Sequence, residues 1–287
     1  MEKTSWPLSN YHTHCYLDDG NGPLEEYVTT AIEKGFTALG FSCHTPVSPP
    51  DEWHMKQEDF IIYAKEVFRL KEKYSTKIEL YLSLEFDYLD DTQQLLGSEY
   101  EHHLDYTIGA VHCIKHNLSD SYLTVDGPIE EFDTLLQDNF SSNIKDFVAY
   151  YYDQQIALMR QYDVDVLAHC DLIKKPNANN RYFDPSEKWY QELTFQFLKE
   201  VKQRGTRLEI NTGALARKTL TEVYPSIEML KMCKVLDIPL LLSSDAHNKE
   251  HIDFAFDSTC KLLLDIGITS LDAFIENQWN TYQVGSR

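Results

Sequence analysis

The sequence lacks the features of several large protein classes. No apolar run in its 287 residues approaches the ~20 residues needed to span a bilayer. Residues 1–7 show no basic region followed by an apolar stretch, so we expect no signal peptide and a cytoplasmic location. Positive charge is scarce, with 26 Lys and Arg against 46 Asp and Glu, which gives a formal net charge of −20. This balance argues against a nucleic-acid backbone as the main partner. A small phosphorylated substrate stays compatible with it, because bound metal cations can dominate the local field.

Common nucleophile and thiolate-metal motifs are absent as well. The six cysteines form no C-x-x-C pair, which disfavours a thiolate zinc site. No G-x-S-x-G or C-x₅-R pattern offers a serine or cysteine nucleophile. Neighbours on a strand face opposite sides, so cysteines beside histidines are expected to be small buried residues behind them, not ligands or disulfide partners. Four cysteines fit this description: Cys15, Cys43, Cys113 and Cys170.

The chain does contain a regular alternation of short apolar runs and longer amphipathic segments. No linker, repeat or low-complexity run divides it, so we expect one domain over residues 1–287. Seven alternations predict an α/β fold in which a parallel sheet with crossover helices closes into a distorted, TIM-like (β/α)₇ barrel. The predicted strands are residues 10–15, 38–44, 78–86, 104–114, 164–172, 207–212 and 239–247. The predicted helices are residues 24–34, 56–74, 128–139, 143–162, 185–204, 225–237 and 251–265.

The predicted helix ends carry suitable residues. Proline suits the first helical turn, asparagine suits the cap, and glycine suits the position after the last turn. The residues concerned are Pro128, Pro185 and Pro225 at starts, Asn143 at a cap, and Gly35, Gly205 and Gly267 at ends.

Polar residues gather at the carboxyl ends of the predicted strands, where barrels of this kind place their function. His12 and His14 share one face of a strand. Glu85 points away from the apolar face made by Leu80, Leu82 and Leu84, and a buried carboxylate needs a cation. The other strand ends carry His44, His112, His169, Asn211, Asp245 and His247. Histidine and carboxylate ligands on seven strands predict a site for divalent metal ions such as Zn, Mn or Fe.

Other polar residues have simpler interpretations. Asn211 could tie down backbone, Asp171 could cap a helix or pair with a cation, and Asp18 and Asp19 could be turn residues before Gly20. We expect solvated surface positions for His54, His102, His103, His116 and His251.

The strand-end motifs together resemble those of the PHP (polymerase and histidinol phosphatase) family, in its histidinol-phosphate phosphatase branch. The matching segments run in family order: His12-x-His14 with Asp19-Gly20, Gly40 to His44, Ser83 to Glu85, Gly109-x-Val111-His112, His169-x-Asp171-Leu172-Ile173, Glu209 to Thr212, and Ser244 to His247. The resemblance implies a (β/α)₇ barrel with a trinuclear metal centre. The first metal would take His12, His14, Glu85 and Asp245. The second would take Glu85, His112 and His169, and the third would take Asp19 (or Asp18), His44 and His247.

The expected reaction follows from such a centre. Closely spaced metals lower the pKa of a bound water and grip phosphoryl oxygens. We therefore expect metal-activated hydroxide to attack the phosphorus of a phosphate ester. The resemblance implies that the ester is histidinol phosphate, which is cleaved to L-histidinol and phosphate in histidine biosynthesis. Glu85 and His247 would act in the centre, Asp171 could protonate the leaving alkoxide, and Arg217, Lys174 or Lys175 would meet the phosphate. Two to three divalent ions per chain are expected.

Other functions remain open at this stage. They are a PHP phosphoesterase for another small phosphate monoester, an exonuclease, which the net charge disfavours, and a metal-binding regulatory barrel without turnover. An amidohydrolase would share the opening H-x-H but usually carries a bridging lysine on strand four, where this chain has His112.

Overall fold

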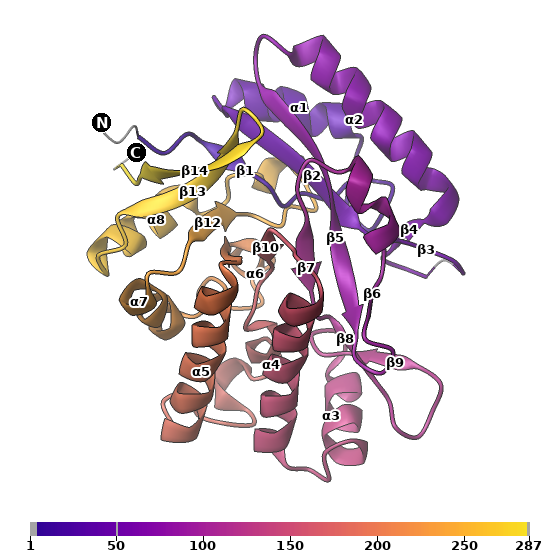
Figure 1. Ribbon diagram of the computed structural model, residues 1–287, viewed down its shortest axis with the longest axis vertical. Coiled ribbons are helices and arrows are strands. Elements are labelled where there is room, and N and C mark those ends of the chain that lie inside the picture. The colour runs from indigo at the N-terminus through magenta and orange to yellow at the C-terminus, as the bar shows by residue number, and fades with distance from the viewer. Residues whose placement is uncertain (1–4, 50, 286–287) are drawn as a thin grey trace.

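The computed structural model describes residues 5–49 and 51–285, and its centre is a barrel of parallel strands (Figure 1). Seven strands follow one another in the sheet in the order of the chain: β1 (Ser9–Asn10), β2 (Ala38–His44), β5 (Glu79–Leu89), β7 (Ile108–Ala110), β10 (Val166–Leu167), β11 (Arg207–Asn211) and β12 (Leu240–Ser243). Beyond β1 and β12, a parallel bridge between Thr13 and Ala246 joins the two edges. The barrel is therefore nearly closed, and the predicted seven-stranded α/β fold is confirmed.

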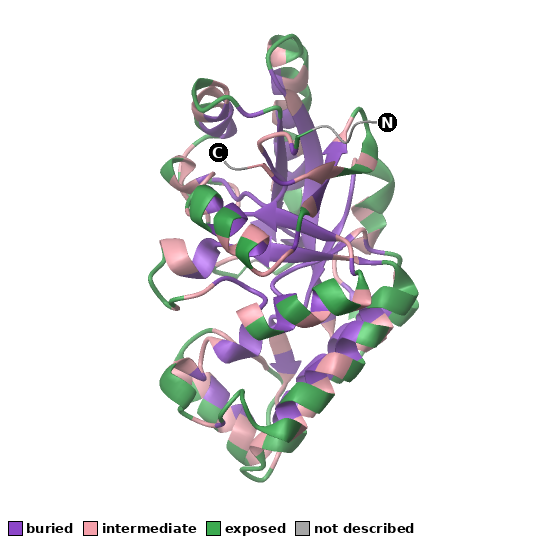
Figure 2. Cartoon of the chain, turned by 90° about the vertical axis from the view of Figure 1, so that its left-hand side faces the viewer, coloured by how far each residue is buried: buried purple, intermediate pink, exposed green. Residues whose placement is uncertain are grey.

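Amphipathic helices cover the outside of this barrel. They are α1 (Leu24–Glu33), α2 (Phe60–Tyr74), α3 (Ile129–Asp138), α4 (Ile144–Gln161), α5 (Lys188–Arg204), the short α6 (Gly213–Ala216), α7 (Ile227–Leu236) and α8 (Phe256–Asp265). In α1 the buried residues Leu24, Tyr27, Val28 and Ala31 recur at helical spacing and form one apolar stripe. Figure 2 shows the consequence, with buried strands inside and helices whose exposed faces point outward. In the described residues, none of the helices combines the length and the apolar character required to cross a membrane.

Helix ends agree with the sequence in part. Asn143 caps α4 by accepting a hydrogen bond from the Lys145 backbone N–H at 3.1 Å, and Gly205 ends α5 with a φ of 75°. Pro185 and Pro225 were expected inside first turns, but α5 and α7 begin later, at Lys188 and Ile227. The Ser226 side chain, which accepts from the Met229 N–H, supplies the cap of α7 instead.

The remaining elements are short. They are β3 (Pro46–Val47) paired with β4 (Met55–Lys56), β6 (Gln94–Leu95) paired with β5, β8 (Cys113–Lys115) paired with β9 (Tyr122–Thr124), and 3₁₀ turns at Gln57–Asp59, Ser98–His103, Leu172–Lys174, Ala178–Asn180 and Lys249–His251. Several predicted elements are thus shorter than expected. The fourth strand divides into β7 and β8, and the helix predicted from residue 251 begins at Phe256.

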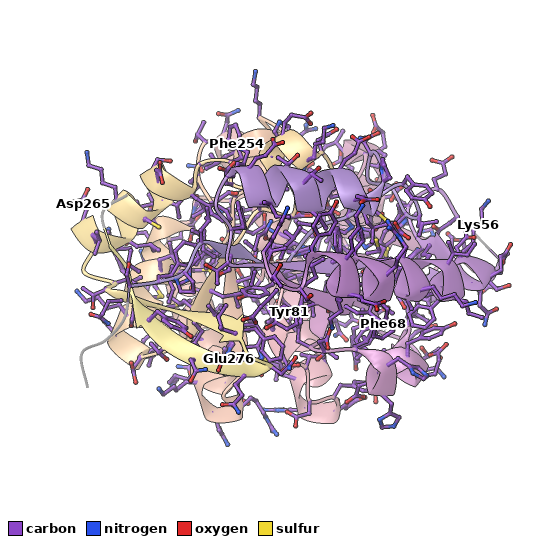
Figure 3. The ribbon with its side chains drawn as sticks, turned by 90° about the horizontal axis from the view of Figure 1, so that it is seen from above. Lys56, Phe68, Tyr81, Phe254, Asp265 and Glu276 are labelled. Atoms are coloured by element: carbon purple, nitrogen blue, oxygen red, sulfur yellow. The ribbon has the colours of Figure 1, made fainter. Side chains whose placement is uncertain are left out.

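A hairpin that the sequence did not predict closes the amino end of the barrel. Its strands are β13 (Ser270–Ile275) and β14 (Gln278–Gln283). The Glu276 N–H at its turn donates to Glu79 at 2.8 Å, and Figure 3 labels Glu276 close to Tyr81 of β5. The Trp279 indole donates to Asp165, which precedes β10, at 3.2 Å. The carboxyl end of the barrel stays open for a site.

Candidate metal centre

Six side chains rich in nitrogen and oxygen converge at the carboxyl ends of the strands. Glu85 lies on β5, where the strand register places it directly beside His44 of β2. The other five of these side chains follow β1, β7, β10 and β12, and all six are buried. They are His12, His14, Glu85, His112, His169 and Asp245. Residues far apart in the sequence therefore form one cluster, as the sequence predicted.

Glu85 lies at the centre of this cluster. Its Oε2 is 3.1 Å from His12 Nε2 and 3.2 Å from His44 Nδ1. Its Oε1 is 2.9 Å from His169 Nε2 and 3.4 Å from His112 Nε2. His14 Nε2 lies 3.7 Å from the same Oε2. One carboxylate therefore faces five imidazoles, three on one oxygen and two on the other, as a ligand shared by neighbouring metal ions would.

The second carboxylate of the cluster, Asp245, faces the two N-terminal histidines. Its Oδ1 is 3.1 Å from His14 Nε2 and 3.7 Å from His12 Nε2. Asp245 and His169 both have positive φ, 49° and 22°. Such backbone costs on the order of 1–3 kcal/mol for a residue with a Cβ and is typical of functional sites. These outliers point to a site held in place against local backbone preference.

Asp19, rather than Asp18, faces the outer edge of the cluster. Asp19 Oδ1 is 3.1 Å from His247 Nε2 and 3.9 Å from His44 Nε2. Asp18 instead accepts from His14 Nδ1 at 2.7 Å and from the Cys15 N–H at 2.9 Å. Gly20 is required after this pair, because a Cβ there would collide with the Cys15 backbone.

The donor set fits divalent metal ions. Among the residues that the structure describes, five groups of side chains have ligand atoms within 4.8 Å of one another. Three correspond to the expected metal positions: His12, His14 and Asp245; Glu85, His112 and His169; and His14, Asp19, His44 and His247. The other two are Cys15, Asp18 and Cys43, and His44, Asp87 and His112. Within the described part of the chain, the buried His12 Nε2, His14 Nε2 and His44 Nδ1 make no hydrogen bond, although each lies 3.1 to 3.2 Å from a carboxylate oxygen. Buried polar atoms without a hydrogen bond are rare and costly, so this arrangement fits metal ligands.

The carboxylates and histidines of the cluster shift one another's pKa. Burial acts to lower the pKa of His12, His14 and His112, but the neighbouring carboxylates raise it above the usual value in all three. Burial alone would raise the pKa of Glu85, but the surrounding histidines, led by His12 and His112, hold that pKa well below its usual range. Burial lowers the pKa of His44 to about 4, although Glu85 opposes the shift. His44 is therefore neutral at pH 7, which is the form that binds metals.

A cavity of about 570 Å³ adjoins the cluster. Two of the three cationic residues predicted to bind phosphate line it, and the third does not. Arg217 and Lys175 line it. Arg217 Nη2 lies 2.8 Å from Asp245 Oδ2, and Lys175 Nζ lies 2.9 Å from Asp126 Oδ2. Both cations therefore stand beside the cluster, where a phosphate could reach them.

Asp171 and Lys174 lie elsewhere. Neither lines this cavity, and both are buried. Asp171 Oδ2 accepts from the Ser226 N–H at 2.8 Å and lies 3.3 Å from Lys174 Nζ. Lys174 Nζ also donates to the Val223 carbonyl at 2.5 Å. These contacts fit the capping and ion-pair interpretation of Asp171, not contact with a substrate.

Comparison with known proteins identifies the family. The family model of the PHP domain matches residues 10–213, well over half of the chain. The chain belongs to the PHP family. A Schizosaccharomyces pombe PHP relative named "Probable histidinol-phosphatase" is 28% identical over 280 residues, covering 92% of this chain and 88% of that protein. The histidinol-phosphatase of Bacillus subtilis is 25% identical over 264 residues, covering 86% and 95%.

A solved structure has the same PHP barrel. The histidinol phosphate phosphatase of Lactococcus lactis, complexed with zinc, L-histidinol and phosphate, superposes with a TM-score of 0.69 at 19% identity. The alignment covers 96% of this chain and 99% of that one. At this identity the likeness shows that the fold is shared.

Three carboxylates lie behind the PHP cluster; Glu209 and Asp87 were not assigned a role from the sequence, and Asp18 was considered only as a turn residue or as the alternative to Asp19. Glu209 Oε1 accepts from His12 Nδ1 at 2.6 Å, while its Oε2 accepts from the His169 N–H at 3.0 Å. Asp87 Oδ1 lies 2.5 Å from His112 Nδ1, and Asp18 holds His14 in the same way. Carboxylates of this kind fix the orientation and tautomer of histidine ligands. Asp87 could have been found, because it shares a strand face with Glu85 two residues earlier.

The predicted surface histidines have mixed outcomes. His102 and His103 are exposed, as expected, while His116 and His251 are half-buried. The prediction for His54 is wrong: it is buried, with Nδ1 2.7 Å from Asp51 and Nε2 3.2 Å from Asp87. The contact with Asp87, which lies 33 residues away in the sequence, holds His54 in the interior.

Two predictions about neighbouring residues hold. Cys15, Cys43 and Cys170 are buried free thiols, as expected, whereas Cys113 is a free thiol that is only half-buried. Asn211 does tie down backbone, because its Oδ1 accepts from the Gly213 N–H at 2.8 Å.

Proposed function

We propose that this PHP protein is a metal-dependent phosphatase that hydrolyses L-histidinol phosphate to L-histidinol and phosphate. The observation that carries the proposal is the set of buried imidazole nitrogens without a hydrogen bond around Glu85, beside a cavity with two cationic side chains. Relatives named histidinol-phosphatase that align over most of their length support the substrate. The corresponding place in metabolism is histidine biosynthesis. We also propose one domain over residues 1–287, because the described core is a single apolar cluster.

We propose three metal positions, held as the sequence resemblance implies. The first uses His12, His14, Glu85 and Asp245; the second uses Glu85, His112 and His169; the third uses Asp19, His44 and His247. The three groups of donor atoms support this division. Imidazole and carboxylate donors suit Zn, Mn or Fe. The third position, with an oxygen ligand from Asp19, favours the harder ions of this set.

The chain's own residues would bind and orient the ester. Arg217 is held by Asp245 and keeps further N–H donors for a phosphoryl oxygen, and Lys175 stands across the cavity. Metals bound in such a centre supply a hydroxide-generating Lewis acid and neutralise charge on the phosphoryl oxygens. The buried carboxylates Glu209, Asp87 and Asp18 hold three histidines so that their other ring nitrogens face the cluster. Asp171 does not line the cavity and contacts Ser226 and Lys174 instead, so we do not propose it as the general acid.

The test is phosphate release from L-histidinol phosphate against a panel of sugar phosphates and nucleotides, using metal-supplemented protein. The proposal expects a clear preference for L-histidinol phosphate in kcat/KM. Equal activity on the panel would overturn the substrate while leaving a phosphoesterase, and no phosphate release from any ester would overturn the phosphatase.

A further inference from the structure

Trp53 stands against the histidines of the cluster. Its ring centroid lies 4.7 Å from that of His44 and 5.5 Å from that of His112, at interplanar angles of 88° and 76°. The indole is half-buried and lines the cavity beside the cluster. It also lines a second cavity of about 940 Å³. Trp53 is therefore a wall shared by the two cavities, immediately beside the reaction centre.

This wall is fixed in position by the barrel. The Trp53 ring lies against that of His54, with centroids 3.7 Å apart and an interplanar angle of 32°. His54 is held between Asp51 and Asp87, and the second oxygen of Asp51 accepts from the Trp53 and His54 N–H groups at 3.2 and 2.8 Å. Asp87 of β5 also holds His112. The indole and the cluster thus share one support, which presents a preorganised aromatic surface to a ligand.

Glu131 of α3 lines the same two cavities and offers a carboxylate oxygen. Its Oε2 accepts from the N–H and the hydroxyl of Thr124, both at 2.6 Å. Its Oε1 has no partner within the described residues. Two other acids on these walls are already paired, Asp51 with His54 and Asp126 with Lys175. Among the other acids on these walls, Glu52 and Glu99 are exposed, while Asp19, Glu85, Asp87 and Asp245 face histidines. Glu131 therefore remains as the half-buried carboxylate that can accept from a bound cation.

We propose that Trp53 and Glu131 form the subsite for the alcohol part of the substrate and select an alcohol that carries both an ammonium group and a flat ring. This inference rests on the proposed phosphatase function. With the phosphoryl group at Arg217 and Lys175, the rest of the ester extends along the cavity wall. An indole favours contact with a flat ring and with a cation, and the half-buried carboxylate of Glu131 favours the ammonium. Neutral or compact phosphate esters gain nothing from either residue.

The experiment measures kcat/KM for three esters: L-histidinol phosphate, 2-aminopropyl phosphate, which has the ammonium but no ring, and propyl phosphate, which has neither. We expect Trp53→Ala to lose about tenfold on L-histidinol phosphate and little on propyl phosphate, with Trp53→Phe retaining most of the preference. We expect Glu131→Gln to lose about tenfold on both cationic esters and little on propyl phosphate.

Matched controls lie on the same chain. Trp189→Ala removes a half-buried indole on α5, and Glu130→Gln removes an exposed carboxylate next to Glu131; neither residue lines the cavity, so both should keep all three activities. Equal losses on the three esters in the Trp53 and Glu131 variants would overturn the subsite. Wild-type protein without preference for L-histidinol phosphate would overturn the proposed substrate. Calorimetric binding of L-histidinol to the same variants then decides the subsite independently, and unchanged affinity would overturn it.

Discussion

Replacing Glu209 by Gln tests whether the carboxylates behind the cluster hold the metal ligands in place. Glu209 is almost fully buried and accepts three hydrogen bonds, from His12 Nδ1 at 2.6 Å, the His169 N–H at 3.0 Å and Asn211 Nδ2 at 2.9 Å. Glutamine has the same shape but only one acceptor oxygen. If that oxygen faces His12, the amide N–H₂ faces two other donors.

The magnitude follows from these contacts. At least one of the three donors loses its acceptor in either orientation of the amide, and two lose it in the orientation that keeps His12. A buried donor without an acceptor costs about 1–3 kcal/mol, so we expect Glu209→Gln to lower the free energy of unfolding by about 2–4 kcal/mol. Loss of a carboxylate that orients a histidine ligand typically lowers metal affinity by about 10–100-fold.

Two assays on one preparation separate the effects. Urea unfolding gives the stability of the metal-free protein, and competition with a fluorescent chelator gives the metal affinity. The matched control is Asp272→Asn. Asp272 is a buried carboxylate of β13 that pairs with Arg207 Nε at 2.9 Å, at the opposite end of the barrel. We expect this control to lose stability but to keep its metal affinity. Wild-type metal affinity in Glu209→Gln, or an equal loss in Asp272→Asn, would refute the reasoning.

Three further predictions concern other contacts. Arg217→Ala should raise KM for the phosphate ester and weaken inhibition by inorganic phosphate at least tenfold, because a charge-assisted contact is worth about 1.5–3 kcal/mol; steady-state kinetics measure both. Asp171→Asn should keep kcat within about twofold, since Asp171 contacts Ser226 and Lys174 outside the cavity, but should lower Tm. Glu25 joins α1 to Arg69, Lys73 and Tyr74 of α2, and hydrogen bonds led by that from Lys73 lower its pKa from 4.5 to about 2. A lowered carboxyl pKa stabilises the fold above pH 4.5, and this contribution is lost as the pH falls towards 2. Glu25→Gln should therefore reduce stability by about 0.5–1 kcal/mol at pH 7, and its difference in Tm from wild type should shrink below pH 4.5.

Each of these has a contradicting result. An unchanged KM in Arg217→Ala would remove Arg217 from the phosphate site. A drop of a hundredfold or more in kcat for folded Asp171→Asn would restore Asp171 as a catalytic group. A Tm difference for Glu25→Gln that stays constant from pH 7 to pH 3, or an equal difference for the control Glu33→Gln on the same helix, would contradict the pH argument.

The barrel and its cluster were predictable because strand alternation is a strong local rule. His12 and His14 flank the bridging residue Thr13, so they share a face although β1 itself ends at Asn10. Glu85 follows the same rule, because alternation places it on the strand face opposite Leu80, Leu82 and Leu84. Burying a carboxylate without a cation costs free energy, so Glu85 indicated metal ions from the sequence alone.

Predictions from the sequence were less successful for residues outside the barrel strands. Position in the sequence suggested Asp171 as a group that could protonate the leaving alkoxide, but a 3₁₀ turn begins at Leu172 and the Asp171 side chain accepts from the Ser226 N–H. His54 was misjudged because its partner Asp87 lies 33 residues away. The β13–β14 hairpin was missed although its pairing is local. Its two-residue turn, Glu276 and Asn277, needs positive φ at both positions, and it lacks the glycine that usually marks such a turn in a sequence.

The central claim is that the cluster around Glu85 binds the metals that make the chain a phosphatase. The most direct measurement quantifies metal per chain by mass spectrometry in wild type and Glu85→Gln, together with phosphate release from L-histidinol phosphate in the same samples. The account predicts two to three divalent ions in wild type, with activity that chelation removes and metal restores, and a loss of at least one ion with nearly all activity in Glu85→Gln. Fewer than two ions per chain after supplementation, or full activity in metal-free protein, would contradict it.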